Sequence, residues 1–275
     1  MQFKTWTLGL CAAVGLSLSA GAALADGHGG KEEAHDWGPY QVEDRRSGFT
    51  YATKETQAIQ MDNFENPGML WVETGQELWE TEEGEAGKAC ASCHEDAAET
   101  MKGVATVYPK YDAKLGKLVN IEQRINMCRT ENMKADAWKW ESEQLLGMTT
   151  FIRHQSLGMP MNVKVDGEAA PFFEKGKAFY YERRGQLDMA CSHCHADHAG
   201  EMLRANTLTQ GQGNGFPTYR LKWQKVGSLH RRFRGCNGQV RADRFGYGSE
   251  EYTNLELYVM WRGRDLPVET PAVRN

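Results

Sequence analysis

Two features are missing from this sequence, and each absence removes a class of function. After the first 25 residues no stretch is apolar enough to cross a bilayer as a helix, so we expect a soluble protein that is not embedded in a membrane. There is also no excess of basic residues, because 32 Lys and Arg face 37 Asp and Glu and the net charge is −5. A mildly acidic chain argues against nonspecific binding to nucleic acid as its main role.

The first residues form a predicted export signal. Lys4 provides a short positive start, residues 8–23 are small and apolar, and Ala23-Leu24-Ala25 matches an A-x-A cleavage pattern. We expect cleavage after Ala25 and a periplasmic protein, which removes Cys11 and leaves six cysteines. An even number of cysteines in an exported chain would suggest three disulfides, but the spacing indicates a different use.

Four of these cysteines lie in two C-x-x-C-H motifs, which are the attachment signature of haem c. On a helical turn, thiols three residues apart reach the two vinyl groups of one porphyrin, and the next histidine lies under the iron. A disulfide or a zinc site is the alternative, and a second copy of the motif weakens it. We therefore predict two haem c cofactors, bound by Cys90, Cys93 and the proximal ligand His94, and by Cys191, Cys194 and the proximal ligand His195.

The sequence around the motifs is repeated. The motifs lie 101 residues apart, and each has matching glycines fifteen and six residues before its first cysteine. The matching pairs are Gly75 and Gly176, Gly84 and Gly185, and Ala89 and Ala190. Downstream, Ile121-x-x-Arg124-Ile125-x-x-Cys128 matches Leu229-x-x-Arg232-Phe233-x-x-Cys236, and a proline lies nineteen residues before the last cysteine of each copy.

This repetition predicts a mostly α-helical fold of two tandem cytochrome c-like domains, each with a covalently bound haem c. Apolar periodicity predicts a closing helix around residues 145–152 and another around residues 255–261. Gly158-Met-Pro160 marks a break between the copies. The expected divisions are a signal peptide at 1–25, an N-terminal extension at 26–65, a first cytochrome c domain at 66–160 and a second, with the active site, at 161–275.

The sixth iron ligand is the unusual part of the pattern. Electron-carrier cytochromes c use Met or a second His there, whereas the repeated residue here is Cys128 or Cys236. The two cysteines could form a disulfide, stay buried free thiols, or each act as the distal ligand of its own haem. We favour distal ligands because each copy has its own cysteine. A thiolate ligand would lower the reduction potential of the haem. Methionine alternatives, several more simply read as core residues, are Met127, Met133, Met148, Met159, Met161, Met202 and Met260.

The two copies differ in charge. Between residues 216 and 246 eight residues are basic and only Asp243 is acidic, whereas residues 108–136 hold six basic and four acidic residues. Some of these arginines are expected to be solvated or to pair with haem propionates. Arg231, Arg232 and Arg234 crowd Cys236, favour its thiolate and attract small oxyanions. In a helix Arg232 would lie on the face of Cys236.

The flanks of Cys236 also distinguish the copies. Gly235 and Gly238 bracket it and allow another chain or a ligand to approach closely. Met127 takes the position of Gly235 in the first copy, so that copy is expected to be more closed. A thiolate near an electron acceptor and open to anions suits redox chemistry on sulfur.

At these residues the chain resembles the SoxA family of dihaem cytochromes, along essentially the whole mature sequence. The most specific parts are the paired C-x-x-C-H motifs and the segment Arg232-Phe-Arg-Gly-Cys236-Asn. The resemblance implies an L-cysteine S-thiosulfotransferase that works as a heterodimer with the monohaem cytochrome SoxX. The pair would couple thiosulfate oxidatively to a cysteine of the carrier SoxYZ, and two electrons would pass through haem to a soluble cytochrome c.

The same resemblance implies residue roles. Cys236 would be the catalytic residue, a cysteine persulfide that also ligates haem, and Arg232 would bind substrate. Cys128 would be the distal ligand of the first haem, which is less clearly involved in turnover. Two rival functions stay open: a plain periplasmic dihaem electron carrier, and a haem-based sensor, for which no attached signalling domain is visible in the sequence.

Overall fold

The computed structural model describes residues 35–275 together with Gln2. The predicted signal peptide, its cleavage after Ala25 and residues 26–34 of the predicted extension lie outside the described residues. Residues 36–275 form one compact unit. Across these residues, no helix combines the length and the apolar character that a membrane span requires.

Residues 36–66 form a series of short elements, and the last of them packs against the end of the chain. The elements are η1 (Gly38–Tyr40), β1 (Gln41–Val42), β2 (Arg45–Arg46), η2 (Gly48–Tyr51) and α1 (Lys54–Met61). Helix α1 begins after Thr53, whose hydroxyl accepts a hydrogen bond from the Thr56 N–H. The side-chain amide of Asn66 donates to the backbone oxygen of Pro271 at 2.9 Å. This segment is therefore tied to the C-terminal strand β9 (Ala272–Arg274).

The first repeat builds a helical unit around its C-x-x-C-H motif. Its elements are α2 (Met69–Glu80), α3 (Ala91–His94), α4 (Ala97–Thr100), η3 (Val104–Val107), β3 (Lys110–Asp112), β4 (Lys117–Val119), α5 (Ile121–Cys128), the π turn η4 (Arg129–Met133) and α6 (Glu143–His154). Strands β3 and β4 form an antiparallel hairpin. Helix α5 starts where Asn120 and Gln123 form a capping box, so the sequence sets its first turn locally.

The second repeat shares the main plan of the first: a first helix, a C-x-x-C-H turn, a β hairpin, a cysteine-bearing helix and a closing helix. Its elements are η5 (Gly167–Ala169), α7 (Ala170–Tyr181), the π turn η6 (His193–Asp197), β5 (Met202–Leu203), β6 (Asn206–Thr207), β7 (Thr218–Arg220), β8 (Lys225–Gly227), α8 (Leu229–Gln239) and α9 (Glu250–Arg262). The small hairpin β5–β6 follows the second motif, where the first repeat has α4 and η3. Strand β7 pairs with β8 as β3 does with β4, and it also takes β9 as a parallel neighbour.

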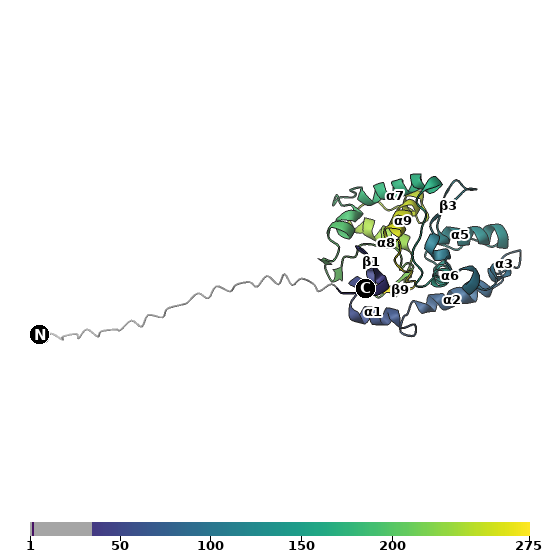
Figure 1. Ribbon diagram of the computed structural model, residues 1–275, viewed down its shortest axis with the longest axis horizontal. Helices are drawn as coiled ribbons and strands as arrows, with labels where there is room; N and C mark the ends of the chain where they lie inside the picture. Colours follow the sequence, from purple (N-terminus) through teal and green to yellow (C-terminus); the bar gives the residue numbers. More distant parts are fainter. Residues whose placement is uncertain (1, 3–34) are drawn as a thin grey trace. The chain divides into compact units, whose positions relative to one another are not determined.

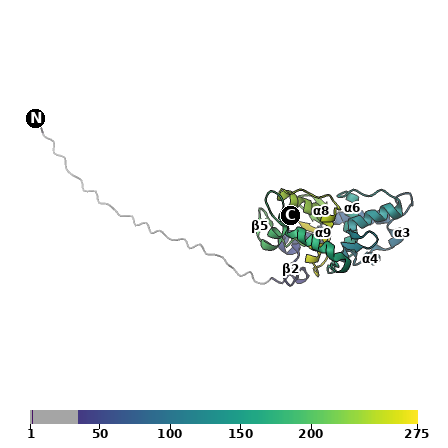
Figure 2. The same ribbon diagram turned by 90° about the horizontal axis from the view of Figure 1, so that it is seen from above.

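The repeated glycines show why the two units fold alike. A Cβ on Gly75 would lie 2.3 Å from the Gly147 oxygen, and one on Gly176 would lie 2.0 Å from the Asn254 oxygen. Both glycines therefore let the first helix of their repeat cross its closing helix closely, α2 on α6 and α7 on α9 (Figure 1). Figure 2 shows α6 and the pair α8 and α9 from above.

The predicted closing helices are confirmed, since residues 145–152 lie in α6 and residues 255–261 lie in α9. Helices hold 45% of the residues, in agreement with the expected mostly α fold. One hydrophobic cluster includes residues of both repeats, so the boundary at residues 160 and 161 stays a prediction. Four methionines considered as ligands are buried in the interior: Met133, Met148, Met161 and Met260.

Candidate functional site

Helix α8 brings the strongest site candidates of the second repeat together. It begins after Ser228, whose hydroxyl accepts a hydrogen bond from the Arg231 N–H at 3.1 Å. The Arg232 N–H then bonds to the Ser228 oxygen at 3.2 Å, so the helix is already regular at this point. The segment is a helix, which was the condition for Arg232 to share a face with Cys236, and Arg232 lies one turn before Cys236.

Cys236 faces the imidazole of His195. The Nδ1 atom of His195 lies 2.7 Å from the backbone oxygen of Thr209, and the ring also hydrogen-bonds to Cys236. Gly211 lies flat against the same ring, because a Cβ there would be 2.8 Å from the imidazole Cγ. A hydrogen bond from Nδ1 to a backbone carbonyl is the support that metal-ligating histidines usually have, and it leaves Nε2 for the metal.

The charge around Cys236 favours its thiolate. Burial raises the pKa of this thiol, but the charge of Arg232, the hydrogen bond from His195 and the charge of Arg220 lower it more. The net result is a pKa of about 6, against 9.0 for an ordinary cysteine. Cys236 is therefore mainly ionised at neutral pH.

The attachment cysteines lie near the distal cysteine in both repeats. Burial, and next the nearby Cys236, raise the pKa of Cys191 to about 12, and the same two causes raise the pKa of Cys194. In the first repeat, burial and then Cys128 raise the pKa of Cys90 to about 11. All six cysteines of the described residues are free thiols, so the alternative Cys128–Cys236 disulfide is not formed.

The first repeat holds its distal cysteine in a different electrostatic setting. Burial raises the pKa of Cys128, and the lowering effect of Arg124 does not compensate for it. Arg124 forms an ion pair with Asp112, which lies at the end of β3. The cation near Cys128 is thus already neutralised by a carboxylate of its own repeat.

Arg220 is the residue that sequence reasoning missed. It lies at the end of β7, where Asp112 lies at the end of β3, and each is sixteen residues before the cysteine of its repeat. Arg220 is one of the eight basic residues between 216 and 246, and its match to Asp112 is the signal that singles it out. The pair Asp112 and Arg124 thus corresponds to Arg220 and Arg232.

Other arginines near Cys236 have structural partners. Arg231 pairs with Glu141 at 3.4 Å, and its guanidinium lies 4.5 Å from the Trp223 ring centroid. Arg234 donates to the backbone oxygen of Phe245 and lies over Tyr247. The cluster predicted from Arg231, Arg232 and Arg234 is therefore divided, and of these three Arg232 has the largest effect on the pKa of Cys236.

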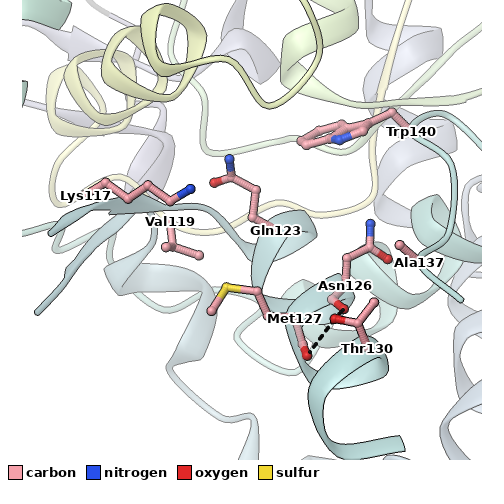
Figure 3. A pocket seen from close by; sticks show the side chains of 8 residues that line it. All are labelled: Lys117, Val119, Gln123, Asn126, Met127, Thr130, Ala137 and Trp140. Carbon is pink, nitrogen blue, oxygen red and sulfur yellow. Dashed lines mark hydrogen bonds between the residues drawn. The ribbon is translucent and has the colours of Figure 1, made fainter. Parts of the chain in front are cut away.

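The flanking positions of the two distal cysteines also differ. A Cβ on Gly235 would meet no atom within 4 Å, so this side of α8 is open. Gly238 is covered instead, since a Cβ there would lie 2.3 Å from the Arg244 guanidinium. Met127 lines a surface cavity of roughly 300 Å³ with Val119, shown in Figure 3. Of the described residues, eight line this cavity, and Cys128 is not among them.

The second motif fits a haem c. The charge of Arg184 lowers the pKa of the predicted attachment residue Cys191, so the two side chains are near each other. The Nε atom of Arg184 is buried and has no hydrogen-bond partner among the residues described. Such an orphaned donor suits a carboxylate of the kind that haem propionates offer. The ring of His195, supported by Thr209, and the nearby thiol of Cys236 are donors of the types that haem iron accepts.

The helices and the paired C-x-x-C-H motifs are those of the cytochrome c class. In agreement, a family model described as the SoxA/TsdA cytochrome c domain matches residues 74–161. That range begins within α2 and extends past the end of α6, so it covers most of the first repeat.

Comparison with curated proteins identifies the family. The chain is 51% identical to the L-cysteine S-thiosulfotransferase subunit SoxA of Pseudaminobacter salicylatoxidans, over 83% of this chain and 80% of that one. It is 42% identical to the subunit of the same name from Paracoccus pantotrophus, over 98% and 99% of the two chains. A crystal structure of SoxXA from P. pantotrophus matches with a TM-score of 0.81 and 44% identity, covering 84% of this chain and 87% of that one. The chain belongs to the SoxA family.

Proposed function

We propose that this protein is the SoxA-type subunit of an L-cysteine S-thiosulfotransferase, working as a heterodimer with a SoxX-type monohaem cytochrome. The names of the curated relatives and the SoxXA structure support this proposal. The plain electron-carrier alternative is not favoured, since the relatives are named as transferase subunits. We further propose a periplasmic location after cleavage behind Ala25, as is typical of c-type cytochromes.

Two haem c groups are proposed, one in each repeat. The first would be held by Cys90, Cys93, His94 and Cys128, and the second by Cys191, Cys194, His195 and Cys236. When bound, haem c supplies an electron acceptor whose potential a thiolate ligand lowers. The Thr209 oxygen keeps the His195 ring oriented, because it accepts the Nδ1 hydrogen bond at 2.7 Å.

The reaction proposed is the oxidative coupling of thiosulfate to a cysteine of a SoxYZ-type carrier. The carrier thiol loses its proton, a bond forms between its sulfur and the sulfane sulfur of thiosulfate, and two electrons leave to a soluble cytochrome c. Arg232 would bind the anion through its fixed fork of N–H donors. Cys236 would act as the catalytic sulfur, carried as a persulfide.

The single observation that carries this proposal is the placement of Cys236 on α8, one turn after Arg232 and beside the His195 ring, where both neighbours favour the thiolate. Its test is the pair of variants Cys236→Ser and Cys128→Ser in the SoxX-bound protein. Coupling of thiosulfate to the carrier is expected to be lost in Cys236→Ser and kept in Cys128→Ser, with both haems still attached. Full coupling activity in Cys236→Ser would contradict the catalytic role.

A second measurement examines the sulfur itself. The oxidised protein is expected to give low-spin His/thiolate signals in low-temperature electron paramagnetic resonance. The Cys236 peptide is expected to carry an extra mass of about 32 Da, one sulfur atom, in mass spectrometry. A Met or His signature at the second haem, with an unmodified peptide, would favour the plain electron carrier.

A further inference from the structure

His230 holds the first turn of helix α8. It is the second residue of this helix, two residues before Arg232 and six before Cys236, and only 1% of it is exposed. Its Nδ1 atom accepts a hydrogen bond of 3.0 Å from the Gly248 N–H, and its Nε2 atom lies 3.0 Å from the carboxylate of Glu256. Because an amide N–H can only donate, Nδ1 carries no proton, and the Nε2–H group donates to Glu256. Both ring nitrogens therefore fix the ring in place.

The first repeat supplies the face on which this ring rests. Trp140 lies between η4 and α6, and its indole is stacked on the His230 imidazole, with 5.1 Å between the ring centroids and 9° between the planes. A Cβ on Gly248 would lie 3.0 Å from the same indole. Gln123, which lines the cavity of Figure 3 together with Trp140, donates to the Gly248 oxygen at 3.0 Å. The first repeat thus contacts both the ring and the backbone donor that binds it.

Two more residues of the first repeat hold the surroundings of His230. The side-chain amide of Asn120 donates at 2.9 Å to the Glu256 oxygen that also bonds to His230. Glu141 accepts a hydrogen bond of 3.2 Å from the Ser228 N–H at the start of α8, where a helix favours a negative charge. These contacts surround the first turn of α8, so they set the direction of the helix. We refer to the four residues of the first repeat as the α8 clamp: Asn120, Gln123, Trp140 and Glu141.

The clamp acts on the helix that carries the site. An α-helix rises about 1.5 Å per residue, so Cys236 lies about 9 Å along the axis from His230. A helix is stiff over that length, and a tilt or rotation of its first turn therefore displaces the side chains of Arg232 and Cys236. Displacements of about 1 Å are enough to slow a reaction strongly. The matching residue of α5 is Glu122, which has no ring to stack, so the stack belongs to α8.

We propose that His230 is a positioning residue for the coupling of thiosulfate, and that the α8 clamp of the first repeat acts through it to place Arg232 and Cys236. This inference rests on the proposed function, because it concerns the geometry of the same site. It gives the first repeat a part in the reaction that does not depend on its own haem.

The test removes the stack and then restores it, in the SoxX-bound, haem-loaded protein. Trp140→Leu should raise the apparent KM for thiosulfate about tenfold and lower kcat, because misplaced groups bind and react poorly. Trp140→Phe keeps a flat ring and should recover most of the loss. The matched control is Trp138→Leu, since Trp138 is also partly buried but lies over the Arg129 guanidinium, 3.6 Å from the ring centroid. This control should change neither constant.

A spectroscopic measurement separates this inference from the reaction. Low-temperature electron paramagnetic resonance of the oxidised proteins records the signal of the second haem, which is identified as the signal that changes in Cys236→Ser. The signal should shift or broaden in Trp140→Leu, return in Trp140→Phe and stay unchanged in Trp138→Leu. A loss of stability alone would lower the number of folded molecules without moving the signal of those that remain.

A double-mutant cycle tests whether His230 transmits the effect. His230→Gln should also raise KM, because a glutamine side chain does not keep both ring-nitrogen bonds in place. The double variant with Trp140→Leu should be no worse than the worse single variant, since both changes release the same turn of α8. Fully additive losses would show that Trp140 acts elsewhere and would overturn the role of His230.

The outcomes are distinguishable. A Trp140→Leu protein with the wild-type KM and an unmoved second-haem signal overturns the clamp. A fall in kcat that only matches a loss of haem or of folded protein, with KM unchanged, also overturns it. A wild-type complex that fails to couple thiosulfate would refute the proposed function, and the spectra would still decide whether Trp140 positions α8.

Discussion

The two repeats have matching backbone elements and opposite electrostatics. In the first, Asp112 neutralises Arg124, and the pKa of Cys128 is raised by burial. In the second, Arg220 stands at the position of Asp112, and the pKa of Cys236 falls to about 6. Similar scaffolds thus give the two cysteines opposite electrostatic settings. The charge of a few side chains, more than the helix that carries each cysteine, shifts the pKa of its thiol.

The repeats also differ where they meet. Glu122 and His230 occupy matching positions in the second residues of α5 and α8. The Nε2 atom of His230 lies 3.0 Å from the carboxylate of Glu256, which also accepts a hydrogen bond of 2.9 Å from the Asn120 amide. Burial, and then the charge of Glu256, raise the pKa of Glu122 to about 8. This polar cluster links the starts of the two cysteine-bearing helices.

The largest expected effect is on the free energy of unfolding, and it tests whether the two repeats have equivalent helix packing. Gly75→Ala and Gly176→Ala each place a methyl group within 2.3 Å or less of a backbone oxygen of the closing helix. Each should lower the free energy of unfolding by about 3 kcal/mol or more, as overpacking does. Chemical denaturation of the haem-loaded protein measures this. A large loss for one glycine and none for the other would break the structural equivalence.

A smaller effect is expected on the apparent KM for thiosulfate, and it tests whether only the second repeat binds the anion. Arg232→Ala should raise the apparent KM for thiosulfate about tenfold or more, because it removes a charged hydrogen-bond donor. Arg124→Ala should leave KM unchanged and should cost at most about 1 kcal/mol of stability, since its ion pair is partly exposed. Steady-state kinetics of the two variants provide the comparison. An unchanged KM in Arg232→Ala would argue against its binding role.

The third prediction concerns pH and the cluster between the repeats. The folded protein holds a proton on Glu122 up to a pKa of about 8, whereas the unfolded chain releases it near 4.5. The folded state therefore binds more protons between these values, and this contribution to stability is lost as pH rises from about 4.5 to about 8. Glu122→Gln should flatten that part of the profile. Denaturation at several pH values checks it, and an unaltered slope would contradict the protonated Glu122.

Much of the site could be predicted because its signals are local. The C-x-x-C-H motifs, the repeated glycines and the spacing of Arg232 from Cys236 are all short-range patterns, and residues 229–236 do form a helix. Ser228 and Asn120 likewise mark the starts of α8 and α5 by local capping. The closing helices followed from apolar periodicity alone.

The rest depends on contacts between distant segments. The bond from Asn66 to Pro271 joins residues 205 positions apart, and no local pattern indicates it. The anchoring of Arg220 on Asn275 and the link from His230 to Glu256 are likewise set by packing. The ion pair of Arg231 with Glu141 also depends on packing, because Glu141 belongs to the other repeat.

The contact of the N-terminal segment with β9 also has a consequence for the order in which the protein is completed during synthesis. The ribosome makes Asn66 long before Pro271, so residues 36–66 wait for the last strand. Strand β7 gains its parallel neighbour, and Arg220 its backbone acceptor, only when β9 and Asn275 have been made. The Asp112–Arg124 pair can form as soon as its own hairpin and α5 exist. The second repeat therefore depends on the last residues of the chain for these contacts, whereas the first repeat supplies the corresponding contact itself.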